Sequence, residues 1–147
     1  MKTTITLRKV SIPFCEPFRI SNGVAAQKDS VIVEIQRGEH AGFGEAGPLP
    51  GGAYSAETAE SSWERLENEL IPLWFETSYT DPSEVGPVLD GVPGEPFARA
   101  ALEGASWDLA GQEAGKPLWQ MLGSRPRAID SGVAIGIFDV IDELLDR

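Results

Sequence analysis

The sequence predicts an α+β domain, in which a three-stranded antiparallel sheet precedes several helices and the start of a second unit follows. Three observations support this prediction. Strand-like segments with short connections fill the first third of the chain, helical periodicity fills the middle, and a continuous apolar run of strand length lies near the end. The chain is organised around residues 96–123, which are expected to form a long helix, a glycine stop and a short second helix.

Three strands are expected before residue 47. Residues 3–14 alternate well enough for a first strand, residues 29–37 are rich in β-branched residues, and residues 41–46 make a third short strand. Residues 16–23 are expected to form a loop, with their strongest turn signal at Asn22-Gly23. Because the links between consecutive strands are short, an antiparallel meander is favoured.

Helices are expected to follow a loop at residues 47–52, which are rich in proline and glycine. Ser55 is the expected N-cap of a first helix, whose apolar residues recur at helical spacing. Pro72 is expected to end or kink that helix near Ile71. A short helix should begin at Asp81, where a proline follows the cap and a glutamate lies three residues after it.

The central helix carries one main apolar stripe, formed by Ala98, Leu102, Ala105 and Leu109. A second stripe beside it contains Gly104 and Gly111, so the helix is expected to be buried on more than one side, with other backbone close to these glycines. Gly115 suits a left-handed C-cap, Pro117 suits the first turn of the short helix, and Gly123 should end it.

The character of the sequence changes after Gly123. Residues 131–137, SGVAIGI, are a continuous apolar run typical of a strand that is buried on both faces of a parallel sheet. Residues 140–145 begin an amphipathic helix. Together they predict the first β-α unit of a larger domain; the alternative is a compact 147-residue domain that pairs this strand with its own meander.

Composition narrows the classes of partner. The chain has 23 acidic and 12 basic residues and a net charge of −11, which argues against nucleic acid and anionic membranes because both attract basic patches. Cys15 is the only cysteine, so an internal disulfide is excluded. No apolar run resembles a signal peptide or a membrane span, and a cytoplasmic protein is therefore expected.

Residues 42–47 spell G-x-G-x-x-G, the pattern of dinucleotide-binding loops. That pattern must open a helix whose N-terminus faces the pyrophosphate, but here prolines at 48 and 50 follow it. We therefore interpret these glycines as allowing a twisted edge strand and close contact between backbones.

No complete active site can be assembled from the remaining polar residues. His40 and Cys15 are single residues, whereas a structural zinc site needs about four ligands, and nothing positions His40 for catalysis. Four glutamates are interpreted as the solvated side of the first helix: Glu57, Glu60, Glu64 and Glu67. The candidate binding features are loops 17–23 and 48–54, which act either as lids over a site elsewhere or as packing for their own domain.

An ordered set of short motifs resembles the N-terminal part of the enolase superfamily, in its muconate-lactonizing subgroup. Within that subgroup, the sequence looks most like o-succinylbenzoate synthase and N-acylamino acid racemase. The motifs that carry the resemblance are Pro17-Phe18-Arg19, Gly42-Phe43-Gly44-Glu45 with the loop after it, the segments 100–103 and 108–110, Pro117-Leu118-Trp119, and 132–137.

The resemblance implies a capping domain over residues 1–124 and the start of a truncated β/α barrel over residues 125–147. In such enzymes the barrel carries two lysines as acid and base, and three acidic ligands for Mg²⁺, which stabilises the enediolate formed from a small-molecule carboxylate. No catalytic or metal-binding residue of this set maps onto the present chain, which is therefore expected to be inactive alone.

The resemblance also implies substrate contacts from two lid loops and the first barrel strand, at Phe18, Arg19, Ser21, Leu49, Tyr54 and Ala134. Asn22 departs from the aromatic residue that some relatives have there. The expected function is the front part of an enzyme like o-succinylbenzoate synthase of the menaquinone pathway, which abstracts a proton next to a carboxylate and then dehydrates. N-acylamino acid racemase, muconate cycloisomerase, dipeptide epimerase, a non-catalytic binding domain and a homo-oligomeric state stay open.

Overall fold

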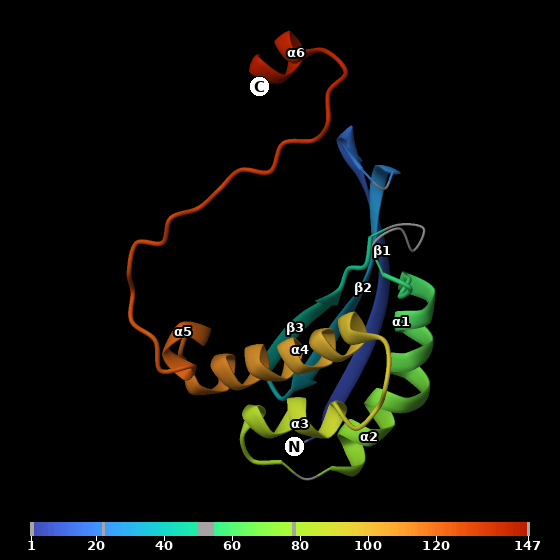
Figure 1. Cartoon of the computed structure of the whole chain (residues 1–147). Coiled ribbons are helices and arrows are strands. Elements are labelled where there is room, and N and C mark those ends of the chain that lie inside the picture. Colours follow the sequence, from blue (N-terminus) through green and yellow to red (C-terminus); the bar gives the residue numbers. More distant parts are fainter. Residues whose placement is uncertain (1, 22, 50–54, 78, 147) are drawn as a thin grey trace.

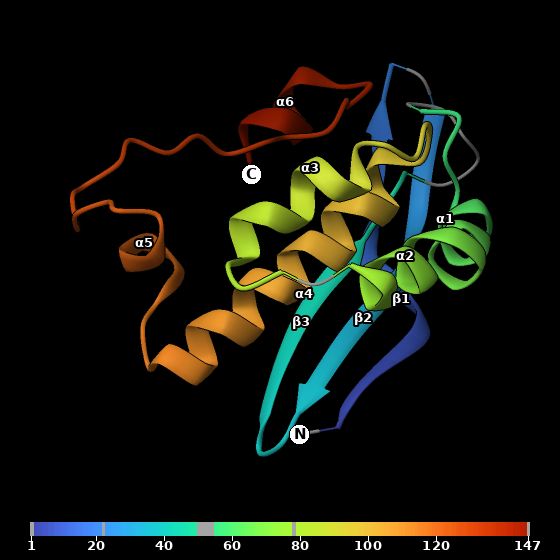
Figure 2. The same cartoon turned by 90° about the horizontal axis from the view of Figure 1, so that it is seen from below.

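The three expected strands form one antiparallel sheet in the order β1-β2-β3, comprising β1 (Thr3–Ile20), β2 (Gly23–Arg37) and β3 (His40–Ala46). Figure 1 shows this arrangement in a computed structural model, which describes residues 2–21, 23–49, 55–77 and 79–146. The helices between residues 59 and 114 lie on one side of the sheet (Figure 2). The predicted α+β class and the meander are therefore confirmed.

The first two strands are longer than predicted, because most of the expected loop 16–23 is paired. β1 continues to Ile20, which pairs with Gly23, and the hairpin needs only two residues for its turn. Asn22, which carried the turn signal, lies outside the described residues. The irregularity is confined to the β1 residues between Pro13 and Phe18, where the register shifts and where Pro17 has no N–H to donate.

The inner face of the sheet has a step in side-chain size between β2 and β3. Val31, Val33 and Ile35 of β2 are fully buried, and their partners on β3 are the small residues Ala46, Gly44 and Gly42. The long helix α4 (Pro96–Ala114) lies over β3, where this step leaves room for it. The small residues of β3 thus permit close contact with the backbone of α4.

The closeness of α4 to β3 explains the two strand glycines. A Cβ atom added to Gly44 would lie 1.9 Å from the carbonyl oxygen of Ala101, and one added to Gly42 would lie 2.3 Å from that of Ala105. The interpretation of the G-x-G pattern as a backbone contact is therefore confirmed. The similar expectation for Gly104 is wrong, because a Cβ there would meet nothing within 4 Å, whereas Gly111 does lie beside the Lys116 carbonyl.

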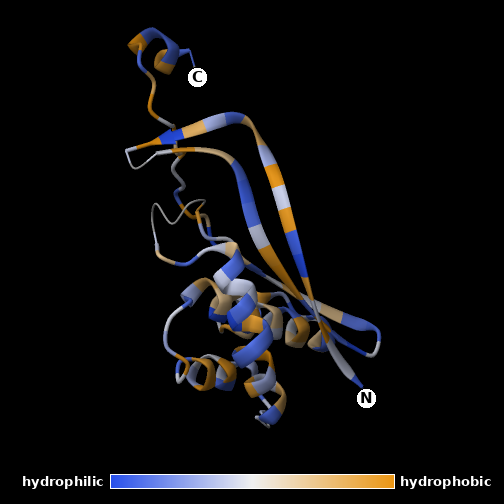
Figure 3. Ribbon diagram, turned by 90° about the vertical axis from the view of Figure 1, so that its right-hand side faces the viewer, coloured by the Kyte–Doolittle hydropathy of each residue, from blue (hydrophilic) through white to orange (hydrophobic). Residues whose placement is uncertain are grey.

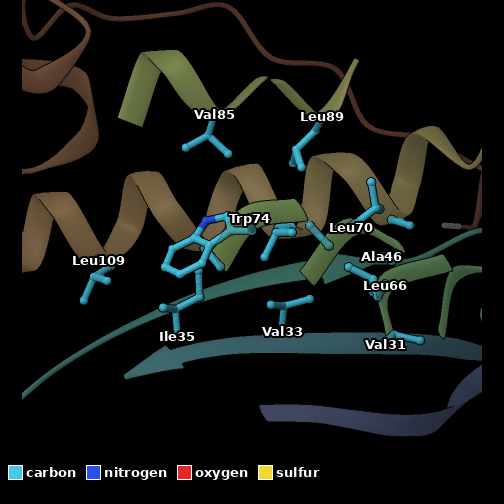
Figure 4. Close-up of a cluster of buried hydrophobic side chains, with 14 of the residues drawn as sticks. Val31, Val33, Ile35, Ala46, Leu66, Leu70, Trp74, Val85, Leu89 and Leu109 are labelled. Atoms are coloured by element: carbon cyan, nitrogen blue, oxygen red, sulfur yellow. The ribbon is translucent and has the colours of Figure 1, made fainter. Parts of the chain in front are cut away.

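The hydrophobic core lies between the sheet, α4 and the shorter helices (Figure 4). These are α1 (Ala59–Arg65), the π-helical η2 (Leu66–Leu70), α2 (Ile71–Glu76), the 3-10 turn η3 (Pro82–Glu84) and α3 (Val85–Leu89). The main stripe of α4 is buried as expected, at Ala98, Leu102, Ala105 and Leu109. The second stripe is buried only at Gly111 and is otherwise half-buried or exposed.

Two expectations for the first helix are wrong in detail. Its N-cap is Thr58 and not Ser55, since the Thr58 side chain accepts from the Ser61 N–H and the Ser61 side chain accepts from the Thr58 N–H in a capping box. The expected end of the helix near Ile71 is also wrong, because helical structure continues through Pro72 to Glu76. The regular α-helix is nevertheless interrupted where the proline was expected to disturb it, by the wider π-helical turn of η2 directly before α2, which accommodates the proline ring.

Glu57 was expected on the solvated side of the helix, but it is only 4% exposed. Its carboxylate accepts hydrogen bonds from the N–H groups of Phe97 (2.8 Å) and Ala98 (2.9 Å), in the first turn of α4, and from the Ser62 hydroxyl (2.6 Å). Glu95, the residue before α4, has a left-handed backbone and makes no side-chain cap. Glu57 therefore caps α4 from another part of the chain.

The C-terminal residues depart most from expectation. Gly115 is the left-handed C-cap of α4 as predicted, and α5 (Leu118–Met121) follows. Residues 131–137 are extended but are not a strand, and Val133 is 84% exposed. A buried strand needs paired neighbours and apolar cover on both faces, and the described residues provide neither. The chain then reaches α6 (Ile141–Leu145) near the tip of the hairpin (Figure 1).

We expect the isolated chain to associate, because Val133, Ile135 and Ile137 expose apolar side chains along an extended backbone. Size-exclusion chromatography at low and high protein concentration should show a shift toward larger species, with binding of an apolar dye. A monodisperse monomer that binds no dye at either concentration would contradict this expectation. Among the described helices, none has the length and apolar character needed to cross a bilayer.

Candidate substrate-binding cavity

A cavity of about 440 Å³ lies between the tip of the β1–β2 hairpin and the C-terminal segment. The hairpin contributes residues 16–19, and the C-terminal part contributes residues 133–139 and Glu143. Figure 3 shows the hairpin extending beyond the helices that pack on the sheet, with α6 near its tip and with apolar and polar residues alternating along its strands. Two parts of the chain that are more than a hundred residues apart therefore meet at this point.

The irregularity in β1 sets the position of the tip. Pairing with β2 is regular up to Pro13 and resumes at Phe18, so the intervening residues bulge out of the ladder. Bulges bend a strand and redirect its side chains, and they are frequent beside functional sites. The resumed pairing fixes the backbone of Phe18 and Arg19 at the edge of the cavity.

Arg19 makes two contacts with the C-terminal segment. Its guanidinium Nη1 lies 2.6 Å from Oδ2 of Asp139, and its carbonyl oxygen accepts from the Ile137 N–H at 3.0 Å. The hydrogen bond and charge of Arg19 hold the pKa of the Asp139 carboxyl below its ordinary value. At Gly136, an added Cβ would lie 3.2 Å from the Arg19 carbonyl oxygen and 3.3 Å from the Phe18 ring, so a glycine allows this approach.

The structure brings together three of the six residues expected at the site, because Phe18, Arg19 and Ala134 all line the cavity. Ser21 is exposed just beyond the end of β1, and Leu49 is half-buried after β3; neither lines the cavity. Tyr54 lies outside the described residues. Whether any of the six contacts a substrate is a proposal, taken up below.

Sequence reasoning missed the acidic residues of this cavity, Glu16, Asp139 and Glu143. The one available signal was the position of Asp139, which follows the apolar run 131–137 after Phe138, where a polar side chain closes a strand-like segment. Its partner, Arg19, is far away in the sequence and could not be inferred from spacing.

The chemistry of the cavity suits binding. Its lining combines apolar side chains with one guanidinium and three carboxylates. Among the residues that the structure describes, no group of three or more His, Cys, Asp or Glu side chains is placed to hold a metal ion.

Comparison with known proteins identifies the family to which this chain is similar. The family model described as the mandelate racemase / muconate lactonizing enzyme N-terminal domain matches residues 2–123. An o-succinylbenzoate synthase from Geobacillus kaustophilus is 35% identical over 142 residues, which is 96% of this chain and 38% of that relative. Other curated relatives are an N-succinylamino acid racemase from Amycolatopsis and a hydrophobic dipeptide epimerase from Roseobacter litoralis.

Solved structures agree with the fold. An enolase-superfamily member from Listeria innocua matches with a TM-score of 0.86 at 29% identity, covering 97% of this chain and 38% of that one. A dipeptide epimerase from Enterococcus faecalis, complexed with Mg and the dipeptide L-Leu-L-Tyr, matches with a TM-score of 0.68 at 33% identity, covering 83% of this chain and 34% of that one.

The chain thus spans about two fifths of the length of the o-succinylbenzoate synthases from two Geobacillus species to which it is similar. The family match over residues 2–123 agrees with the solved structures that share this fold. This chain belongs to the mandelate racemase / muconate lactonizing enzyme family of the enolase superfamily and contains its N-terminal domain.

Proposed function

We propose that this chain is the substrate-capping part of an enzyme like o-succinylbenzoate synthase, which abstracts a proton next to a carboxylate and then dehydrates its substrate. The observation that carries the proposal is the cavity in which Phe18, Arg19 and Ala134 meet. The curated o-succinylbenzoate synthases that match nearly the whole chain support the choice of reaction. N-succinylamino acid racemisation and dipeptide epimerisation are the alternatives that other relatives favour.

We further propose that residues 1–124 form the capping domain and that residues 125–147 begin a barrel. The family match ends at residue 123, beside this boundary. Residues 131–137 would then become the first barrel strand once neighbouring strands cover the apolar side chains that are exposed here. The hairpin tip would lie at one end of that strand, where barrel enzymes bind their substrates.

Magnesium does not fit the residues described here, because they hold no cluster of metal ligands. We propose that a metal ion, as found in the Enterococcus faecalis epimerase structure, is bound by the part of the relatives that this chain does not span. The role of the present residues is to hold the distal part of a small-molecule carboxylate and to exclude water. Leu49, Ser21 and Tyr54 are proposed as further contacts of the same lid.

A chimera tests the proposed function. This chain would replace the matching 142-residue region of the Geobacillus kaustophilus relative, and the product would be assayed with Mg²⁺ for synthesis of o-succinylbenzoate, racemisation of N-succinylamino acids and epimerisation of dipeptides. We expect o-succinylbenzoate synthesis well above the background of the 147-residue chain, which should be inactive with or without Mg²⁺. A folded chimera without any of these activities, or activity of the chain alone, would contradict the proposal.

Phe18→Ala in this chimera is expected to change the ratio of kcat/KM between two substrates with different distal groups by about tenfold, because apolar contacts far from the reacting carbon contribute to transition-state binding. The melting temperature should stay unchanged, since Phe18 lies on the exposed tip of the hairpin. Val24→Ala is the matched control, because Val24 is exposed on the opposite strand and does not line the cavity. If unfolding is the main effect of Phe18→Ala, its role is structural.

A further inference from the structure

The hairpin tip is joined to the C-terminal segment at a single residue of β1. Arg19 uses its carbonyl oxygen to accept from Ile137 and its side chain to pair with Asp139. The backbone hydrogen bond fixes where the two segments touch. The ion pair lies two residues further along the C-terminal segment, and Gly136 lets the Phe18 ring lie against that segment.

The exposure of the pair makes this connection reversible. The side chains of Arg19 and Asp139 are 45% and 76% exposed, so salt screens their attraction and the contact is weak compared with a buried one. Two other carboxylates line the same cavity, Glu16 and Glu143. Asp139 pairs with Arg19 across the mouth of this cavity, from the C-terminal segment to the hairpin tip.

We propose that Asp139 is a positioning residue, which latches the hairpin tip over the cavity by pairing with Arg19. The latch closes the cavity when the pair forms and opens it when the tip moves away. It therefore controls whether a ligand can enter the cavity that Phe18 and Arg19 line. This inference depends on the proposed function only for the identity of the cavity's ligand. The latch is a property of these 147 residues and can be measured without substrate.

Cys15 provides the probe, because it is the only cysteine of the chain, is exposed and lies in the bulge beside the tip. A nitroxide attached to Cys15 broadens the NMR signals of nearby amides in a ¹⁵N-labelled sample. We expect strong broadening at residues 135–139 in the unchanged chain at low salt. A mixture of ¹⁴N chain that carries the nitroxide and ¹⁵N chain that carries none measures the broadening between molecules. This contribution is then subtracted.

The Asp139→Asn variant keeps the shape of the side chain and removes its charge. We expect it to reduce the broadening rate at residues 135–139 by about two- to fivefold, as does raising the salt from about 20 to 500 mM in the unchanged chain. Asp139→Glu should restore most of the broadening. Glu143→Gln is the matched control, because it neutralises another carboxylate of the cavity while leaving the Arg19 pair intact, and it should change nothing.

Several results would overturn the latch: no broadening in the unchanged chain, equal broadening in Asp139→Asn, or an equal loss in Glu143→Gln. The amide signals of the core residues Val33 and Leu102 report whether each variant is folded. In the chimera, Asp139→Asn should raise KM severalfold more than it lowers kcat, with an unchanged melting temperature. An inactive chimera whose tip is still released by Asp139→Asn would reject the proposed function and leave the latch standing.

Discussion

Gly44→Ala is expected to destabilise the domain by about 3 kcal/mol or more, at the upper end of the usual cost of overpacking. The added Cβ would lie 1.9 Å from the Ala101 carbonyl oxygen and 2.9 Å from the Ala105 nitrogen, and both atoms belong to the α4 backbone. Since a backbone cannot rotate out of the way as a side chain does, α4 would have to withdraw from β3. Urea unfolding followed by tryptophan fluorescence measures the loss.

Gly104→Ala is the matched control for Gly44→Ala. This glycine lies within α4, where an added Cβ would meet no atom within 4 Å. Alanine is favoured over glycine inside a helix, so this variant should gain about 0.5–1 kcal/mol of stability. If both variants had the stability of the unchanged chain, the close contact between α4 and β3 would be wrong.

Glu57→Ala should cost about 3 kcal/mol, the second large effect that we expect. The substitution removes the acceptor for two backbone N–H groups in the first turn of α4 and for the Ser62 hydroxyl, all within 2.9 Å. Buried donors that lose their partner cost about 1–3 kcal/mol each, and partial rehydration recovers some of this. Hydrogen exchange at Phe97 and Ala98 should accelerate more than exchange at the other end of α4.

Two further variants distinguish the loss of the helix cap from the loss of a negative charge. Glu57→Gln keeps the length of the side chain and one acceptor oxygen, so its loss of stability should fall between those of the unchanged chain and Glu57→Ala. Glu60→Ala removes an exposed glutamate from the first turn of α1 and should change stability by no more than about 0.5 kcal/mol. Equal losses for Glu57→Ala and Glu60→Ala would refute the capping role of Glu57.

The sequence predicted those parts of the fold that depend on local pattern. The order of the strands, the buried stripe of α4 and the left-handed cap at Gly115 follow from side-chain periodicity and from glycine's conformational freedom. The errors share a different cause. Glu57 looked solvated because its partners, Phe97 and Ala98, lie forty residues away, and helical periodicity gives no information about them.

The same limit applies to the glycines and to the site. Gly42 and Gly104 both indicated close packing, but of these two only Gly42 lies against the backbone of another element. The reason is that α4 turns its main apolar stripe, and not Gly104, toward the sheet. Only part of the candidate site could be predicted from the sequence. Motif resemblance suggested Phe18 and Arg19, whereas Asp139 comes into view only when the two ends of the chain are placed together.

The bulge in β1 has a consequence for how this family can diversify. In a regular hairpin, inserting one residue would shift the pairing of a whole strand and turn every core side chain toward water. Here the ladder already breaks between Pro13 and Phe18, so a change in the length of the tip can be absorbed there while Leu7 stays opposite Val33. The length and sequence of the hairpin tip can thus change without disturbing the domain that carries it.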